Sequence, residues 1–235
     1  MYKKIIISTL VAFVFVGCGG GGNELATSAN SSTTPSTKTS NSSYINPDDI
    51  NLKEDINSGK VKGYDANGDR NSNYLAVLNY LRSLPIKCND SMALEGPSPK
   101  LQWNELLRNS SYEHSKDMGI QEYFEHDGSG KDSDETAKAN HLNRGSKFNE
   151  RIEYNGYDYS ASGENIAMYA TKPDTPPSNS WIDAFDSLIK SRHGHCSNIM
   201  NSGFKDVGVA EYRPDKKDSR GYYRAYWTQD FGTHR

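Results

Sequence analysis

The apolar residues change their spacing along this chain, and that change constrains the fold more than any other feature. Several early segments have helical spacing, whereas Val207 and Val209 alternate with other residues, as do the apolar residues of 222–227. Alternation is typical of strands with one buried face, and the Pro-Asp-Lys-Lys sequence at 214–217 predicts a turn between two of them. A third short strand is expected at residues 166–169. The pattern therefore predicts the α+β class, with helices packed on an antiparallel sheet.

Four helices are predicted where apolar side chains recur every three or four residues. The first has one apolar face, made of Leu75, Leu78, Leu81 and Leu84. Asn71 or Asn73 can cap this helix, and Pro85 follows its end. The others are expected at residues 102–118, 148–154 and 180–190, with their largest apolar side chains inward: Trp103, Leu107, Met118, Trp181 and Phe185. Residues 128–145 and 171–179 are predicted to be loops.

The first 70 residues are predicted to be export and spacer segments. Residues 1–17 combine two lysines with a short apolar run, which predicts a signal peptide rather than a spanning helix. Cys18 resembles the lipidated cysteine of a bacterial lipoprotein; ordinary cleavage nearby or an uncleaved anchor are the alternatives. Residues 18–46 are rich in Gly, Ser, Thr and Asn and are expected to be a flexible tether, and residues 47–70 a polar lead-in. One domain is expected over residues 71–235, held outside the cytoplasm on a membrane of the cell envelope.

The remaining cysteines and the charge limit the possibilities further. If Cys18 carries lipid, Cys88 and Cys196 form an even pair in an oxidising compartment, which favours a disulfide over two free thiols. The formal net charge is −3 and the chain has no basic run, so nucleic acid is an unsuitable partner.

Four short blocks hold the chemically informative residues. They are Tyr-Phe-Glu-His at 123–126, Gly-Glu-Asn-Ile-Ala at 163–167, Gly-His-Cys-Ser-Asn-Ile-Met-Asn at 194–201 and Tyr-Trp-Thr-Gln-Asp-Phe-Gly at 226–232. The residues of these blocks and their order along the chain resemble the CAP superfamily, also called SCP domains, and its bacterial branch in particular. The resemblance extends to Leu-Gln-Trp at 101–103 and to His114 with Met118. It implies a three-layered α-β-α sandwich with a central antiparallel sheet.

The resemblance also implies a cleft lined by two histidines and two glutamates. His126, Glu164 and His195 match three of these four positions and are the candidates for catalysis or for a divalent metal, zinc first. The second glutamate has no match, because Ala184 stands where it is expected, and Asp183 or Asp186 are possible substitutes. Three further residues form a second tier of candidates: His114, Asn165 and Gln229. His193, two residues before His195, is interpreted as incidental.

Three functions are compatible with this sequence. The first is a membrane-anchored binding module whose histidine and glutamate cleft takes a divalent metal, a lipid or a peptide. The second is a metal-assisted or acid-base hydrolase of peptides or envelope material, although the chain has no Gly-x-Ser-x-Gly elbow and no His-Glu-x-x-His helix. The third is a structural protein of the envelope without a ligand. Fold alone does not decide among them.

Overall fold

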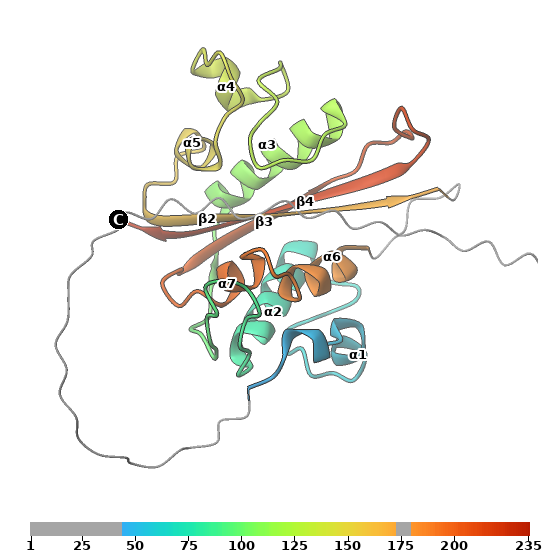
Figure 1. Cartoon of the computed structure of the whole chain (residues 1–235), viewed down its shortest axis with the longest axis vertical. Helices are drawn as coiled ribbons and strands as arrows, with labels where there is room; N and C mark the ends of the chain where they lie inside the picture. The colour runs from blue at the N-terminus through green and yellow to red at the C-terminus, as the bar shows by residue number, and fades with distance from the viewer. Residues whose placement is uncertain (1–43, 173–179) are drawn as a thin grey trace, which may run out of the picture.

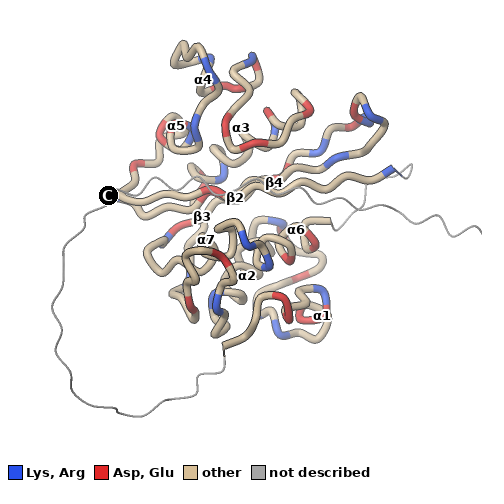
Figure 2. The backbone as a smooth tube through the Cα atoms, viewed as in Figure 1, with Lys and Arg blue, Asp and Glu red and all other residues tan. Residues whose placement is uncertain are grey.

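A computed structural model describes residues 44–172 and 180–235 of the chain. The expected signal peptide, Cys18 and nearly all of the tether lie outside the described residues, as does most of the second predicted loop. Within the described ranges, no helix has the length and apolar content needed to cross a membrane. Basic and acidic residues are interspersed over the helices and strands (Figure 2).

A four-stranded sheet forms the centre of the domain. Its strands are β1 (Gln102–Trp103), β2 (Tyr159–Thr171), β3 (Asp206–Tyr212) and β4 (Tyr223–His234), in the spatial order β1-β3-β4-β2. The predicted hairpin is β3 and β4, which pair antiparallel, and β2 also pairs antiparallel with β4. The three long strands therefore form the predicted antiparallel sheet, and the two-residue strand β1 adds to it in parallel with β3. Between β1 and β3 the chain passes through α3, α4, α5, β2, α6 and α7.

Helices cover both faces of this sheet, which confirms the three-layered sandwich (Figure 1). One layer contains α3 (Glu105–Gln121), α4 (Glu135–Ala139) and α5 (Phe148–Tyr154). The opposite layer contains α2 (Arg70–Ser83), α6 (Ser180–Ile189) and α7 (His195–Met200). Beyond it lie the 3-10 turn η1 (Pro47–Asp49) and α1 (Leu52–Asn57), so part of the expected lead-in folds onto the domain and buries Leu52.

Local hydrogen bonds explain where the helices begin. Asp69, rather than Asn71 or Asn73, caps α2, because its carboxylate accepts from the Ser72 backbone N–H at 2.8 Å. The predicted helix at 102–118 begins later, at Glu105, because Trp103 belongs to β1 and is only half-buried.

Two other elements differ in extent from their predictions. The predicted loop at 128–145 contains α4, whose cap is Asp134. The strand expected at 166–169 extends over the whole of β2, since its polar first half also pairs with β4.

The main hydrophobic core lies between the sheet and the α2, α6 and α7 layer. Trp181 and Phe185 of α6 are buried as predicted, and both rings pack against Tyr74 with centroids 5.1 and 5.3 Å away. The predicted disulfide is confirmed: Cys88 and Cys196 are bonded, with Cα atoms 5.7 Å apart and a separation of 108 positions in sequence. It fastens α7 to the segment after α2. The face of the sheet toward α3 and α5 has only small apolar clusters and buries several charged groups instead.

Candidate functional site

Three residues from separate elements form a buried hydrogen-bonded chain beside strand β2. Glu164 is on β2, which is an edge strand of the sheet. One carboxylate oxygen, Oε1, lies 2.7 Å from Nδ1 of His126, in the segment after α3. The other, Oε2, accepts from the Arg151 guanidinium of α5 at 2.7 Å. Arg151 also donates to the His126 backbone carbonyl at 2.8 Å, so it fixes both the carboxylate and the histidine segment.

The electrostatics of Glu164 keep it ionised. The side chains of Glu164 and Arg151 are each only 1% exposed, and burial alone raises the pKa of such a carboxyl. Burial is the largest single effect, but the Arg151 charge and the His114 and His126 imidazoles together outweigh it and hold the pKa of Glu164 well below its usual range. An ionised carboxylate only accepts hydrogen bonds, so the His126 proton is on Nδ1.

The second imidazole comes from the opposite helical layer. Gly194 has a φ of 88°, a left-handed conformation that glycine adopts easily, and the chain enters α7 at His195 immediately after it. The His195 ring is fully buried and its Nδ1 lies 2.7 Å from the Ser191 hydroxyl oxygen. The rings of His126 and His195 stack, with centroids 6.4 Å apart and planes inclined by 24°. Two histidines separated by 69 positions in sequence therefore meet beside β2.

Amide side chains on the other face of the sheet hold α7 in place. Asn165 donates to the His195 backbone carbonyl and to the Gln229 side-chain oxygen, both at 3.1 Å. Asn198 donates to the Asn165 side-chain oxygen at 2.9 Å and to the Glu164 backbone carbonyl at 3.1 Å. Together with the Cys196 disulfide, this network sets the position of the His195 backbone relative to Glu164.

Comparison with known proteins now defines the family. Residues 75–231, well over half of the chain, match the family model described as CAP, Cysteine-rich secretory protein family. The chain belongs to the CAP family. No curated protein matches it. Among solved structures, it is similar to an outer surface protein from Borrelia burgdorferi, with 15% identity over 59% of this chain and 80% of that chain and a TM-score of 0.38. The resemblance carried by the four sequence blocks is thus confirmed.

His114 is a buried part of this CAP domain, on the same face of the sheet as Glu164. Its Nε2 lies 2.9 Å from the Glu125 backbone carbonyl oxygen. Burial lowers the pKa of His114 to about 4, so the ring is neutral at physiological pH. It thereby secures the turn that leads to His126.

The two aspartates considered as substitutes for the missing glutamate lie elsewhere in the CAP domain. Asp183 pairs with Lys53 at 2.5 Å. Asp186 accepts from the Leu52 backbone N–H at 3.1 Å and pairs with Lys190 at 2.6 Å. Both carboxylates therefore join α6 to the segment around α1. His193, next to Gly194, is exposed, and its backbone N–H donates to the Ser191 hydroxyl oxygen at 3.2 Å.

Arg151 and Asp230 are important residues that the sequence did not single out. Asp230 is directly opposite Glu164 in the register of β2 and β4, so both side chains are on one face. It is fully buried, and its carboxyl oxygens make no hydrogen bond within the described part of the chain. Burial and the Glu164 charge raise the pKa of Asp230 well above its usual value. Asp230 was visible inside the last sequence block, whereas Arg151 lies in no block at all.

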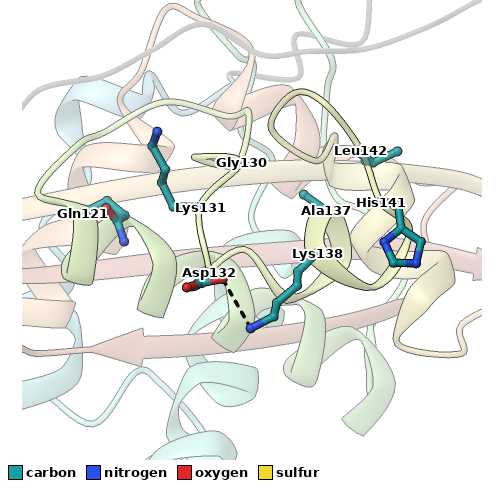
Figure 3. A pocket seen from close by; sticks show the side chains of 8 residues that line it. All are labelled: Gln121, Gly130, Lys131, Asp132, Ala137, Lys138, His141 and Leu142. Atoms are coloured by element: carbon teal, nitrogen blue, oxygen red, sulfur yellow. Dashed lines mark ion pairs between the residues drawn. The ribbon is translucent and has the colours of Figure 1, made fainter.

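Figure 3 shows a different hollow of the CAP domain, beside α4, with a volume of about 590 Å³. Its lining includes Lys131, Asp132, Lys138 and His141, all of them exposed. Asp132 and Lys138 form an ion pair at 3.3 Å. Since all four of these charged or polar side chains are exposed, this hollow is a weaker candidate than the histidine pair.

Proposed function

We propose that this protein is a binding module of the bacterial cell envelope, whose His126 and His195 pair takes a divalent cation, zinc first. The observation that carries the proposal is the 2.7 Å contact between His126 Nδ1 and Glu164 Oε1. Because the proton is on Nδ1, the neutral His126 ring has its lone pair on Nε2. A histidine oriented by a carboxylate in this way is the usual form of an imidazole metal ligand.

The side chains present fit a cation held by two imidazoles, with Glu164 orienting the His126 ring. Both oxygens of Glu164 are engaged by His126 and Arg151, so in this proposal the predicted ligand Glu164 orients His126. Among the described residues there is no group of three His, Cys, Asp or Glu side chains placed to hold a metal ion. The protein therefore supplies two nitrogen ligands, and water or a donor group of the bound molecule would supply the rest.

The spacing of the rings is close to what such a pair requires. Imidazoles that share a zinc ion about 2.0–2.1 Å from each nitrogen have ring centres roughly 5–6 Å apart. The observed separation is 6.4 Å with the planes inclined by 24°, so the His126 ring would move closer and turn to bring both in-plane lone pairs onto one ion. When bound, the cation would act as a Lewis acid toward the ligand that completes its coordination.

An extracytoplasmic, membrane-anchored location is part of the same proposal. The CAP family is named for secretory proteins, and the chain has an export-type segment ahead of Cys18. A disulfide that joins Cys88 and Cys196 is also suited to an oxidising compartment.

Calorimetric titration of the full chain with zinc tests the proposal. The double variant His126→Ala/His195→Ala is compared with His141→Ala/His234→Ala, which removes two exposed histidines outside the pair. We expect about one equivalent of zinc to bind to the wild type and to the second variant, and binding to be lost in the first. Loss in both variants, or no binding to the folded wild type, contradicts the proposal. Screening peptide hydrolysis on the zinc-loaded wild type then decides whether the module is also an enzyme.

A further inference from the structure

A smaller cavity, of about 290 Å³, lies at the C-terminal end of α3, between this helix and the end of the β3–β4 hairpin. Direct contacts join the two elements there. The Glu122 carboxylate accepts from the Ser219 backbone N–H at 3.0 Å. Gly119 brings α3 so close to Tyr212 that a Cβ atom would lie 2.4 Å from the ring. The cavity is therefore bounded by packed elements, and its described lining contains neither residue of the histidine pair.

Aromatic rings form much of the described lining. Tyr212 and Tyr226 are directly opposite each other in the register of β3 and β4. Their side chains are therefore on one face of the sheet, with Cβ atoms roughly 4.5–5.5 Å apart. Tyr222 comes from the segment between the two strands, and Pro214 and the exposed Ile120 add apolar surface. A molecule in the cavity would thus contact mainly flat, apolar groups.

The Tyr226 hydroxyl marks the inner end of the cavity. Tyr226 is only 1% exposed, and no hydrogen bond reaches its hydroxyl within the described part of the chain. Burial raises the pKa of Tyr226 to about 12, so the hydroxyl keeps its proton and can donate as well as accept. The charges of Arg224, Asp218 and Glu122, which all line the cavity, also act on this pKa. The hydroxyl is therefore at the cavity end of the ring.

The charged groups of the described lining are either engaged or exposed. The Asp218 carboxylate accepts from the Arg224 guanidinium, and the Glu122 carboxylate is bound to the hairpin. Lys216 and Lys217 are exposed. A ligand inside the cavity therefore meets aromatic surface and a neutral hydroxyl, and neither carboxylate needs it as a counter-charge.

We propose that this cavity binds a neutral sugar ring, either as a free sugar or as the end unit of a glycan. The C–H face of a pyranose ring packs on aromatic side chains, and the hydroxyl groups at its edge donate and accept hydrogen bonds. These properties match the tyrosine rings and the Tyr226 hydroxyl, since ligand sites combine mainly apolar walls with a few placed polar groups. The volume of about 290 Å³ suits one sugar unit. This ligand is independent of the cation proposed for the histidine pair.

NMR titration of the full chain with N-acetylglucosamine, its linear trimer and cyclohexanol tests this proposal. In Tyr226→Phe, which removes only the hydroxyl oxygen, we expect both sugars to bind about fivefold more weakly, because one hydrogen bond is lost. This variant keeps the ring and its packing, so weaker binding does not come from a damaged fold. Tyr154→Phe removes the hydroxyl of an exposed tyrosine outside the cavity, and it should bind as the wild type does.

The outcomes separate the ligand sources and decide the proposal. Tighter binding of the trimer than of the single sugar supports a glycan end, and equal binding supports a free sugar. No binding of either sugar by the folded wild type at millimolar concentration overturns the proposal. Unchanged binding by Tyr226→Phe, or an equal loss in Tyr154→Phe, also contradicts it. Cyclohexanol binding as tightly as the sugars would do the same, because the cavity would then recognise apolar surface alone.

Discussion

Replacing Glu164 with glutamine tests whether the buried charge on the α3 face depends on this one carboxylate. The substitution keeps the size of the side chain but removes its charge. It leaves the Arg151 guanidinium, which is 1% exposed, without the carboxylate 2.7 Å away. The remaining acceptors of Arg151 are neutral: the His126 carbonyl, the Ser146 carbonyl and the Ser146 hydroxyl.

The expected magnitude follows from the cost of an uncompensated buried charge. Removing one partner of a buried ion pair costs about 3–5 kcal/mol, and the neutral acceptors that remain place this site near the lower end. Asp230 is a second reason for a value near the lower end. Its pKa is raised partly by the Glu164 charge, so in Glu164→Gln the pKa falls and Asp230 can ionise beside Arg151. We therefore expect Glu164→Gln to lower the free energy of unfolding by about 3 kcal/mol at pH 7.

Urea unfolding of Glu164→Gln, Asp230→Asn and the double variant measures this effect. The double variant has neither carboxylate near Arg151, so its loss should exceed the sum of the single losses by at least about 1 kcal/mol. Glu135→Gln is the matched control, because it breaks a half-exposed pair with Lys116 and should cost less than about 1 kcal/mol. Additive losses, or a Glu164→Gln loss no larger than that of the control, would refute the reasoning.

Three further results are expected. Cys88→Ser/Cys196→Ser removes a disulfide between residues 108 positions apart and should lower the free energy of unfolding by about 3–5 kcal/mol. Wild type treated with a reductant should show a similar loss in the same measurement. For Asp230, the folded pKa is above the unfolded one, so the unfolded state ionises first and wild-type stability is lost as pH rises from about 4. The stability of Asp230→Asn relative to the wild type should therefore increase between pH 3 and pH 7, and a flat difference would contradict the buried protonated acid. Gly208→Ala should cost about 2 kcal/mol or more in urea unfolding, because its Cβ would lie 2.0 Å from the Arg108 backbone nitrogen and push α3 off β3.

The sequence predicts the layers of this fold because the change of hydrophobic period is a local signal. The β3–β4 hairpin and the inward face of α6 follow from it directly. The full length of β2 does not, because residues 159–165 are mostly polar and belong to a strand only through pairing with β4. The helix α3 starts later than predicted for the same reason. Trp103 fits the helical spacing of the apolar residues, but it pairs with Val207 in the sheet. Non-local pairing overrides local pattern at both positions.

The candidate site is predictable only as far as its residues lie in recognisable blocks. The sequence blocks name His126, Glu164 and His195, and the fold brings these three together. Arg151 has no such signal: its residue type suits a surface helix, and only the packing of α5 beside β2 reveals the buried pair. The role of Asp230 follows only from the register of β2 and β4, which places it opposite Glu164.

The buried charges also indicate that the two faces of the sheet have different roles, one in stability and the other in ligand binding. A buried ion pair is often no more stabilising than apolar residues of the same volume, so the Glu164–Arg151 pair is a poor source of stability. Stability comes instead from the large apolar core on the α6 face and from the disulfide. What the pair supplies, and apolar residues could not, is an ionised acceptor held rigidly beside His126 Nδ1. That acceptor fixes both the ring and its proton, and so determines which nitrogen of His126 a ligand would meet.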